Sequence, residues 1–143
     1  MREPRKRSEP RKVLFVCIGN SCRSQMAEGF ARTYGADVIV ARSAGLSPAP
    51  IIQPQTHQVM EERNIRLDTQ FPKGLDSFAA SERFDLVINL SGYAIPANLN
   101  APEERWNVAD PIGARIEVYR EVATQLENAV MSLVLRLRNE GRI

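Results

Sequence analysis

One short segment, CIGNSCRS, contains both cysteines of the chain together with an arginine and two serines. Five residues separate Cys17 from Arg23, and Ser24 follows the arginine directly. A cysteine thiolate is a strong nucleophile, and the planar guanidinium of arginine binds two oxygens of a phosphate or arsenate group, which lysine cannot do. The spacing therefore predicts that Cys17 attacks a tetrahedral oxyanion held by Arg23.

The residues between Cys17 and Arg23 are those of a loop that wraps around an anion. Gly19 and Asn20 both tolerate the positive φ angles of a tight turn. Backbone N–H groups that converge at the start of a helix attract anions. Ser24 is expected either to donate a hydrogen bond to the Cys17 sulfur or to act as a simple helix N-cap. We expect the oxyanion to be bound by Ile18, Gly19, Asn20, Ser21, Cys22, Arg23 and Ser24.

Short apolar segments alternate with amphipathic ones along the rest of the chain. Predicted strands cover residues 13–17, 38–42 and 84–90, with a short one at 106–108, and predicted helices cover 22–35, 54–63 and 116–137. This alternation predicts an α/β domain of three layers, with a parallel sheet flanked by helices. Ligands of such folds lie beyond the carboxyl ends of the strands, which is where the first predicted strand ends, at Cys17.

The positive charge of the chain is concentrated at its start. Residues 1 to 12 contain six Arg or Lys and two Glu, within a formal net charge of +2. Because no aromatic residue is interleaved with these charges, we predict a flexible leader over residues 1–11 and no nucleic-acid partner. Residues 12–143 are predicted to form a single catalytic domain. The apolar runs are far shorter than the roughly 20 residues of a membrane span, and no secretory signal is recognisable, so we predict a cytoplasmic protein.

The sequence predicts neither a metal site nor a cofactor. The two cysteines and the single histidine, His57, do not have the paired spacing of zinc ligands. The glycines match neither the nucleotide P-loop motif nor G-x-G-x-x-G.

A longer set of motifs carries a family resemblance. The stretch VLFVCIGNSCRSQMAEGFAR, followed by Ser43-Ala44-Gly45 and Asp110-Pro111, resembles the low-molecular-weight protein tyrosine phosphatases and their thioredoxin-coupled arsenate reductase relatives. The resemblance covers about residues 12 to 140. It implies a four-stranded parallel sheet of flavodoxin-like winding, a covalent cysteinyl intermediate and Asp110 as general acid. On its own, an aspartate before a proline is typical of a turn.

Two branches of this resemblance compete. Gln25-Met26 and Ile112-Gly113 favour the reductases, whereas the two further cysteines with which reductases resolve their intermediate are absent, with Ser91 at one of those places. We therefore predict a phosphomonoester hydrolase of the protein tyrosine phosphatase type, acting on phosphotyrosine proteins or small aryl phosphates. The alternative is an arsenate reductase that uses Cys17 and Cys22 with an external thiol such as thioredoxin or glutathione. A second alternative is a non-catalytic oxyanion-sensing or partner-binding module.

The second cysteine of the loop, Cys22, is predicted to have a redox role. It could form a reversible disulfide with Cys17 that protects the nucleophile from overoxidation. It could also attack an arsenylated Cys17, or be merely a small buried side chain.

Overall fold

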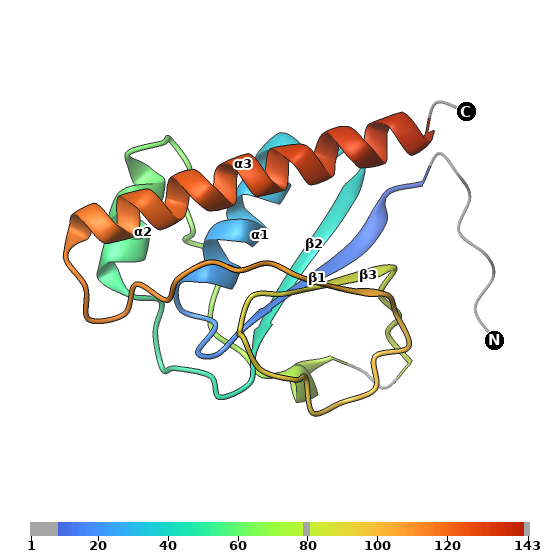
Figure 1. Ribbon diagram of the computed structural model, residues 1–143, viewed down its shortest axis with the longest axis horizontal. Coiled ribbons are helices and arrows are strands. Elements are labelled where there is room, and N and C mark those ends of the chain that lie inside the picture. The colour runs from blue at the N-terminus through green and yellow to red at the C-terminus, as the bar shows by residue number, and fades with distance from the viewer. Residues whose placement is uncertain (1–8, 79–80, 142–143) are drawn as a thin grey trace.

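The computed structural model describes residues 9–78 and 81–141 (Figure 1). At its centre lies a sheet of four parallel strands in the order β2-β1-β3-β4. The predicted α/β class, with a four-stranded parallel sheet flanked by helices, is therefore confirmed. The strands are β1 (Arg11–Cys17), β2 (Ile39–Gly45), β3 (Leu86–Asn89) and β4 (Glu103–Arg105).

The two faces of the sheet are covered differently. One face carries the α-helices α1 (Arg23–Tyr34), α2 (Pro54–Glu61) and α3 (Ile116–Gly141). Successive residues of a strand point to opposite faces, so Val13 and Phe15 of β1 face these helices, whereas Leu14 and Val16 belong to a smaller cluster on the other side. That second cluster is closed by the 3-10 helix η1 (Leu75–Ser77) and irregular segments.

The helix after the cysteine loop ends where the sequence predicts. The N–H of Gly35 donates to the carbonyl of Ala31 at 2.9 Å and closes the last turn of α1. A Cβ atom at Gly35 would lie 2.5 Å from Val134 Cγ2, so this glycine lets α1 and α3 approach closely. None of the helices in the described ranges is long and apolar enough to cross a membrane.

The fourth strand lies three residues before the predicted one. Residues 106–108 were expected to form it, but the strand is Glu103–Arg105, after which the Trp106 N–H still donates to the Asn89 carbonyl at 3.0 Å. The prediction is wrong because β4 lies at the edge of the sheet and carries three charged residues, so no apolar pattern marks it.

Other boundaries also differ from the prediction. The strand expected at 84–90 is Leu86–Asn89, and the helix expected at 54–63 ends at Glu61. β2 was expected at 38–42 and instead extends to Gly45, because it pairs with β1 along its whole length. Most of the predicted leader, residues 1–11, lies outside the described residues. Its last residue, Arg11, already belongs to β1 and donates its N–H to the Val38 carbonyl at 2.8 Å.

Candidate active site

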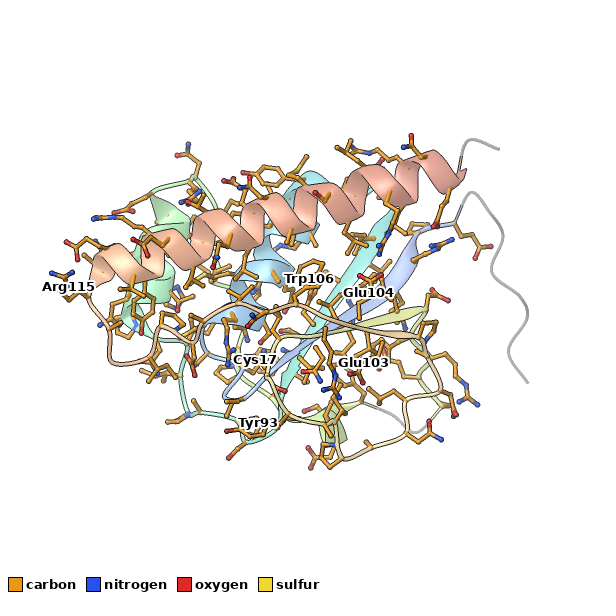
Figure 2. The ribbon with its side chains drawn as sticks, in the orientation of Figure 1. Cys17, Tyr93, Glu103, Glu104, Trp106 and Arg115 are labelled. Atoms are coloured by element: carbon orange, nitrogen blue, oxygen red, sulfur yellow. The ribbon has the colours of Figure 1, made fainter. Side chains whose placement is uncertain are left out.

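The predicted nucleophile lies at the carboxyl edge of the sheet. Cys17 is the last residue of β1 (Figure 2) and is only 3% exposed. Its Sγ atom lies 2.8 Å from Ser24 Oγ, which also accepts a hydrogen bond from Asn20 Nδ2 at 2.7 Å. The helix N-cap is Cys22, so Ser24 contacts the sulfur rather than capping α1.

The peptide groups of the loop are oriented by the segment after β2. The carbonyls of residues 17, 18 and 19 accept hydrogen bonds from the backbone N–H groups of 46, 47 and 49, at 2.8 to 3.0 Å. The Ser21 carbonyl accepts from the Gln53 N–H at 3.1 Å and from Thr56 Oγ1 at 3.0 Å. In a trans peptide the N–H points away from its carbonyl. The N–H groups of residues 18, 19, 20 and 22 therefore face away from that segment, available to an anion.

One predicted backbone feature of the loop is confirmed and one is wrong. Asn20 has a φ angle of 51° and is the left-handed residue of the turn. Gly19 is not among the residues of positive φ. A Cβ atom at Gly19 would lie 3.3 Å from Ser21 Oγ, so its small size suits the packing of the turn rather than an unusual backbone angle.

The fold brings Asp110 to Arg23, which lie far apart in the sequence. Arg23 is 5% exposed, and its Nη1 donates to the carbonyls of Leu90 and Val108 at 2.6 and 3.0 Å. These bonds hold the guanidinium in one plane, and its Nη2 lies 3.5 Å from Asp110 Oδ2. The Ile112 N–H donates to Asp110 Oδ1 at 3.1 Å, so the carboxylate is fixed within its own turn.

Cys22 lies in a different environment from Cys17. It is 2% exposed and its thiol donates to the hydroxyl of Tyr119 at 4.0 Å. Burial raises the pKa of the Cys22 thiol, although side-chain hydrogen bonds from Thr56 and Ser21 oppose the shift. Burial likewise raises the pKa of Tyr119 to about 12, with the neighbouring Cys22 adding to the effect. Since the thiolate is the reactive form, this environment disfavours Cys22 as a nucleophile.

Some residues that support the loop were not recognised from the sequence. Gln25 is fully buried, and its Nε2 lies 3.0 Å from both the backbone carbonyl and Oδ1 of Asn20. The Lys73 N–H also donates to Asn20 Oδ1, at 3.0 Å. A glutamine that directly follows the Arg23-Ser24 pair in the first turn of the helix is the signal that could have identified Gln25, because a buried polar side chain needs hydrogen-bond partners.

The glycine of the SAG motif is explained by its contact with the loop. A Cβ atom at Gly45 would lie 2.7 Å from the Ile18 carbonyl oxygen and 2.9 Å from the Asn20 nitrogen, both backbone atoms. Gly45→Ala is therefore expected to displace the loop and weaken phosphate binding by about tenfold, measured by calorimetry. The matched control is Gly74→Ala, whose Cβ would meet mainly the movable Asp76 side chain. Equal binding by both variants would contradict this role of Gly45.

Ser91 lies at one of the places for which the family resemblance implied a further cysteine. It is buried, and its hydroxyl donates to Asn89 Oδ1 at 2.7 Å. The Asn89 amide in turn donates to the carbonyl of Tyr93 at 2.8 Å. The segment after β3 is thus closed by hydrogen bonds between polar groups rather than by thiols.

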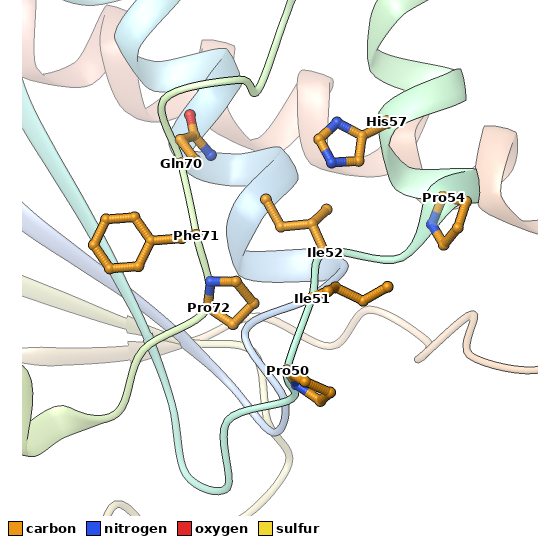
Figure 3. A pocket seen from close by; sticks show the side chains of 8 residues that line it. All are labelled: Pro50, Ile51, Ile52, Pro54, His57, Gln70, Phe71 and Pro72. Atoms are coloured by element: carbon orange, nitrogen blue, oxygen red, sulfur yellow. The ribbon is translucent and has the colours of Figure 1, made fainter.

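An apolar pocket of about 560 Å³ lies beside the loop, next to the segment that binds its carbonyls (Figure 3). His57, for which no role was predicted, lies in its wall. The exposed side chains of Ile51 and Phe71 form part of its rim. The pocket is lined by Pro50, Ile51, Ile52, Pro54, His57, Gln70, Phe71 and Pro72.

Three features of this site agree with those that the family resemblance implied. They are a buried cysteine at the end of a parallel strand, a loop with free N–H groups and an arginine paired with an aspartate. The family model described as low molecular weight phosphotyrosine protein phosphatase matches residues 12–142, and the chain belongs to this family. It is an enzyme of this superfamily, so the alternative of a non-catalytic module is set aside.

Several proteins similar to this chain are arsenate reductases. The glutaredoxin arsenate reductase of Synechocystis sp. is 39% identical over 131 residues, which cover 89% of this chain and 98% of that protein. The arsenate reductase of Bacillus subtilis is 36% identical over 111 residues, covering 75% of this chain and 78% of that protein. A solved structure of an arsenate reductase in the phosphate-binding state has 38% identity and a TM-score of 0.77, covering 89% of this chain and 98% of the other.

The prediction of a phosphomonoester hydrolase acting on phosphotyrosine or aryl phosphates is overturned by these relatives. The arsenate reductases are up to 39% identical, whereas the arginine phosphatase YwlE from Geobacillus stearothermophilus is 22% identical and shares the fold alone. The prediction gave too much weight to the missing relay cysteines. An external thiol can supply the electrons that those cysteines would provide, so their absence does not exclude arsenate chemistry.

Proposed function

We propose that this chain is an arsenate reductase in which Cys17 is the nucleophile and external thiols supply the electrons. The observation that carries the proposal is the 39% identity with a glutaredoxin arsenate reductase, which extends over 98% of that protein. The geometry supports it. The loop directs its free N–H groups away from the segment that binds its carbonyls, and Arg23 is held in place next to Asp110.

The first step forms a covalent intermediate. The Cys17 thiolate attacks arsenic, an As–S bond forms and an As–O bond breaks. The departing group is a hydroxyl of arsenate, which takes one proton from Asp110 and leaves as water. The loop N–H groups and the remaining donors of Arg23 stabilise the negative charge on the other arsenate oxygens. Ser24, whose Oγ lies 2.8 Å from the sulfur, stabilises the thiolate before the attack.

The next steps transfer two electrons. An external thiolate attacks Cys17 Sγ, a disulfide bond forms and the As–S bond breaks. The electron pair of that bond remains on arsenic, which is reduced from As(V) to As(III) and leaves as arsenite after protonation by solvent. A second external thiol then attacks the mixed disulfide, which releases Cys17 and the oxidised reductant. We propose glutathione with glutaredoxin, or thioredoxin, as the source of these thiols, in line with the names of similar proteins.

The test measures arsenite directly. Purified protein is incubated with arsenate and either glutathione with glutaredoxin or thioredoxin with its reductase, and arsenite is separated by chromatography and quantified by mass spectrometry. We expect arsenite to form in proportion to thiol oxidised, at two thiols per arsenite. Absence of arsenite with every reductant, together with rapid hydrolysis of p-nitrophenyl phosphate, would contradict the proposal.

The role of Cys22 is tested by Cys22→Ala. We expect arsenite formation with glutathione to change by no more than about twofold, because the buried Cys22 thiol with its raised pKa is a poor attacking group. Mass spectrometry of the stalled intermediate is expected to show glutathione on Cys17. Two results together would instead identify Cys22 as the attacking thiol. The first is loss of arsenite formation in a Cys22→Ala variant that keeps its thermal stability, and the second is a Cys17–Cys22 disulfide in the parent protein.

A further inference from the structure

We propose that Gln25 and Gln70 are positioning residues that stabilise the thiolate of Cys17 through a chain of hydrogen bonds that all point toward the sulfur. The proposal deepens the function given above, because it rests on Cys17 as the nucleophile. Neither glutamine contacts the sulfur itself, and both would act through Asn20 and Ser24.

Four hydrogen bonds make up this chain. Gln70 Nε2 donates to Gln25 Oε1 at 2.7 Å, and Gln25 Nε2 donates to Asn20 Oδ1 at 3.0 Å. Asn20 Nδ2 donates to Ser24 Oγ at 2.7 Å. Ser24 Oγ lies 2.8 Å from Cys17 Sγ. These hydrogen bonds thus lead from Gln70, which lies in the wall of the apolar pocket (Figure 3), to Cys17.

The direction of each bond is determined by the other partners of each amide. Asn20 Oδ1 also accepts from the Lys73 N–H, so the oxygen of this amide must face that backbone. Gln25 Nε2 faces only acceptors, including the Phe71 carbonyl at 3.0 Å. Because Ser24 Oγ accepts a hydrogen bond from Asn20 Nδ2, its own single proton is left to donate to the sulfur. A sulfur that accepts this bond is favoured as the thiolate.

Hydrogen bonds between aligned amides polarise and so strengthen one another. Gln25 and Asn20 each accept a hydrogen bond at the amide oxygen, and all three amides donate one at the nitrogen. Their dipoles therefore add, with the positive end toward Cys17. Asn20, Ser24 and Gln25 are fully buried, so water does not compete for these bonds. In the low local dielectric, a substitution at Gln70 is therefore expected to change the stability of the Cys17 thiolate.

The first amide of the chain carries an unpaired atom. Gln70 Oε1 is buried and has no hydrogen-bond partner within the described residues. A buried carbonyl oxygen without a partner is unfavourable. Gln70 is therefore poorly explained by stability alone, and an apolar side chain of the same length would remove this unpaired group.

The charged residues already present near the nucleophile and the chain of hydrogen bonds are unchanged in the test. Arg23 and Asp110 belong to the site itself. Lys73 lies beside Asn20, and Glu28 interacts electrostatically with Lys73 and accepts a hydrogen bond from Ser43. None of these four charged residues is altered by substitutions at positions 25 or 70.

The experiment measures the alkylation of Cys17 by iodoacetamide as a function of pH. Tandem mass spectrometry assigns the label to Cys17 rather than Cys22. We expect the midpoint of the rate profile to rise by about one pH unit in Gln25→Met and by about half a unit in Gln70→Met. Gln70→Glu is expected to raise it at least as far as Gln25→Met, because a carboxylate replaces the donor that faces Gln25 Oε1, which favours turning the Gln25 amide over, and adds a negative charge. Gln58→Met, on the exposed face of α2, is the matched control and should not move it.

Thermal unfolding separates this role from a purely structural one. The Met and Glu substitutions at position 70 alter stability by different amounts but are both expected to raise the midpoint. An unmoved profile in Gln25→Met, or in Gln70→Glu if the first variant does not fold, would overturn the proposal. Alkylation requires no arsenate, so a failure of arsenate reduction would leave this result interpretable on its own.

Discussion

Cys17→Ser is expected to abolish arsenite formation while the protein still binds the anion. A serine hydroxyl ionises far less readily than a thiol, and an oxygen atom cannot form the disulfide through which arsenite is released. We expect the rate to fall by at least about 10⁴-fold. The loop N–H groups and Arg23 do not depend on the sulfur, so calorimetry should give a phosphate affinity within about threefold of the parent protein.

The matched control is Cys22→Ser, which makes the same chemical change five residues further along the loop. It is expected to retain arsenite formation, because Cys22 is directed toward Tyr119 rather than placed beside Ser24. Arsenite formation that persists in Cys17→Ser would place the nucleophile elsewhere. Loss of phosphate binding in the same variant would show that the loop needs the thiol to keep its shape.

The positions of Cys17 and Arg23 in the fold could be predicted from the sequence because both belong to one uninterrupted segment. An apolar strand, a turn and an amphipathic helix each carry a local pattern, and Cys17 and Arg23 stand at the two junctions between them. The end of α1 at Gly35 was recognisable for the same reason. The hydrogen bonds that support the loop could not be predicted from the sequence pattern, because Gln25 and Gln70 meet only in the folded chain.

Contacts between distant segments could not be predicted in this way. The 3.5 Å approach of Arg23 to Asp110 depends on the position of the segment after β4. That strand is short, charged and at the edge of the sheet, so no apolar pattern in the sequence indicates a strand there. Without the family resemblance, Asp110 would be interpreted as a turn residue, and in the structure it indeed accepts the Ile112 N–H of its own turn.

The choice between phosphate and arsenate was the step at which the sequence-based prediction was wrong. Both are tetrahedral oxyanions, and the loop from Cys17 to Ser24 would offer either of them the same N–H groups. The two reactions differ in how the covalent intermediate is broken: water breaks a phosphoryl intermediate, whereas a thiol must break the arsenyl one. Since that thiol can come from another molecule, the residues of this chain alone do not distinguish the two reactions.

Asp110→Asn is expected to lower the rate of arsenite formation by about 10²- to 10⁴-fold, the range typical of a lost general acid. The amide has the shape of the carboxylate and keeps an oxygen for the Ile112 N–H, so the turn should stay intact. It cannot give a proton to the oxygen that leaves arsenic. The rate at which arsenate is consumed, measured with Cys17 in excess over arsenate and without an external thiol, isolates this step from the later thiol exchange.

The control is Asp68→Asn, since Asp68 is an exposed aspartate paired with Arg66 on the surface and should leave the rate unchanged. An Asp110→Asn variant with the parent rate would show that the proton comes from another group. The ion pair between Asp110 and Arg23 would then serve to orient the guanidinium alone.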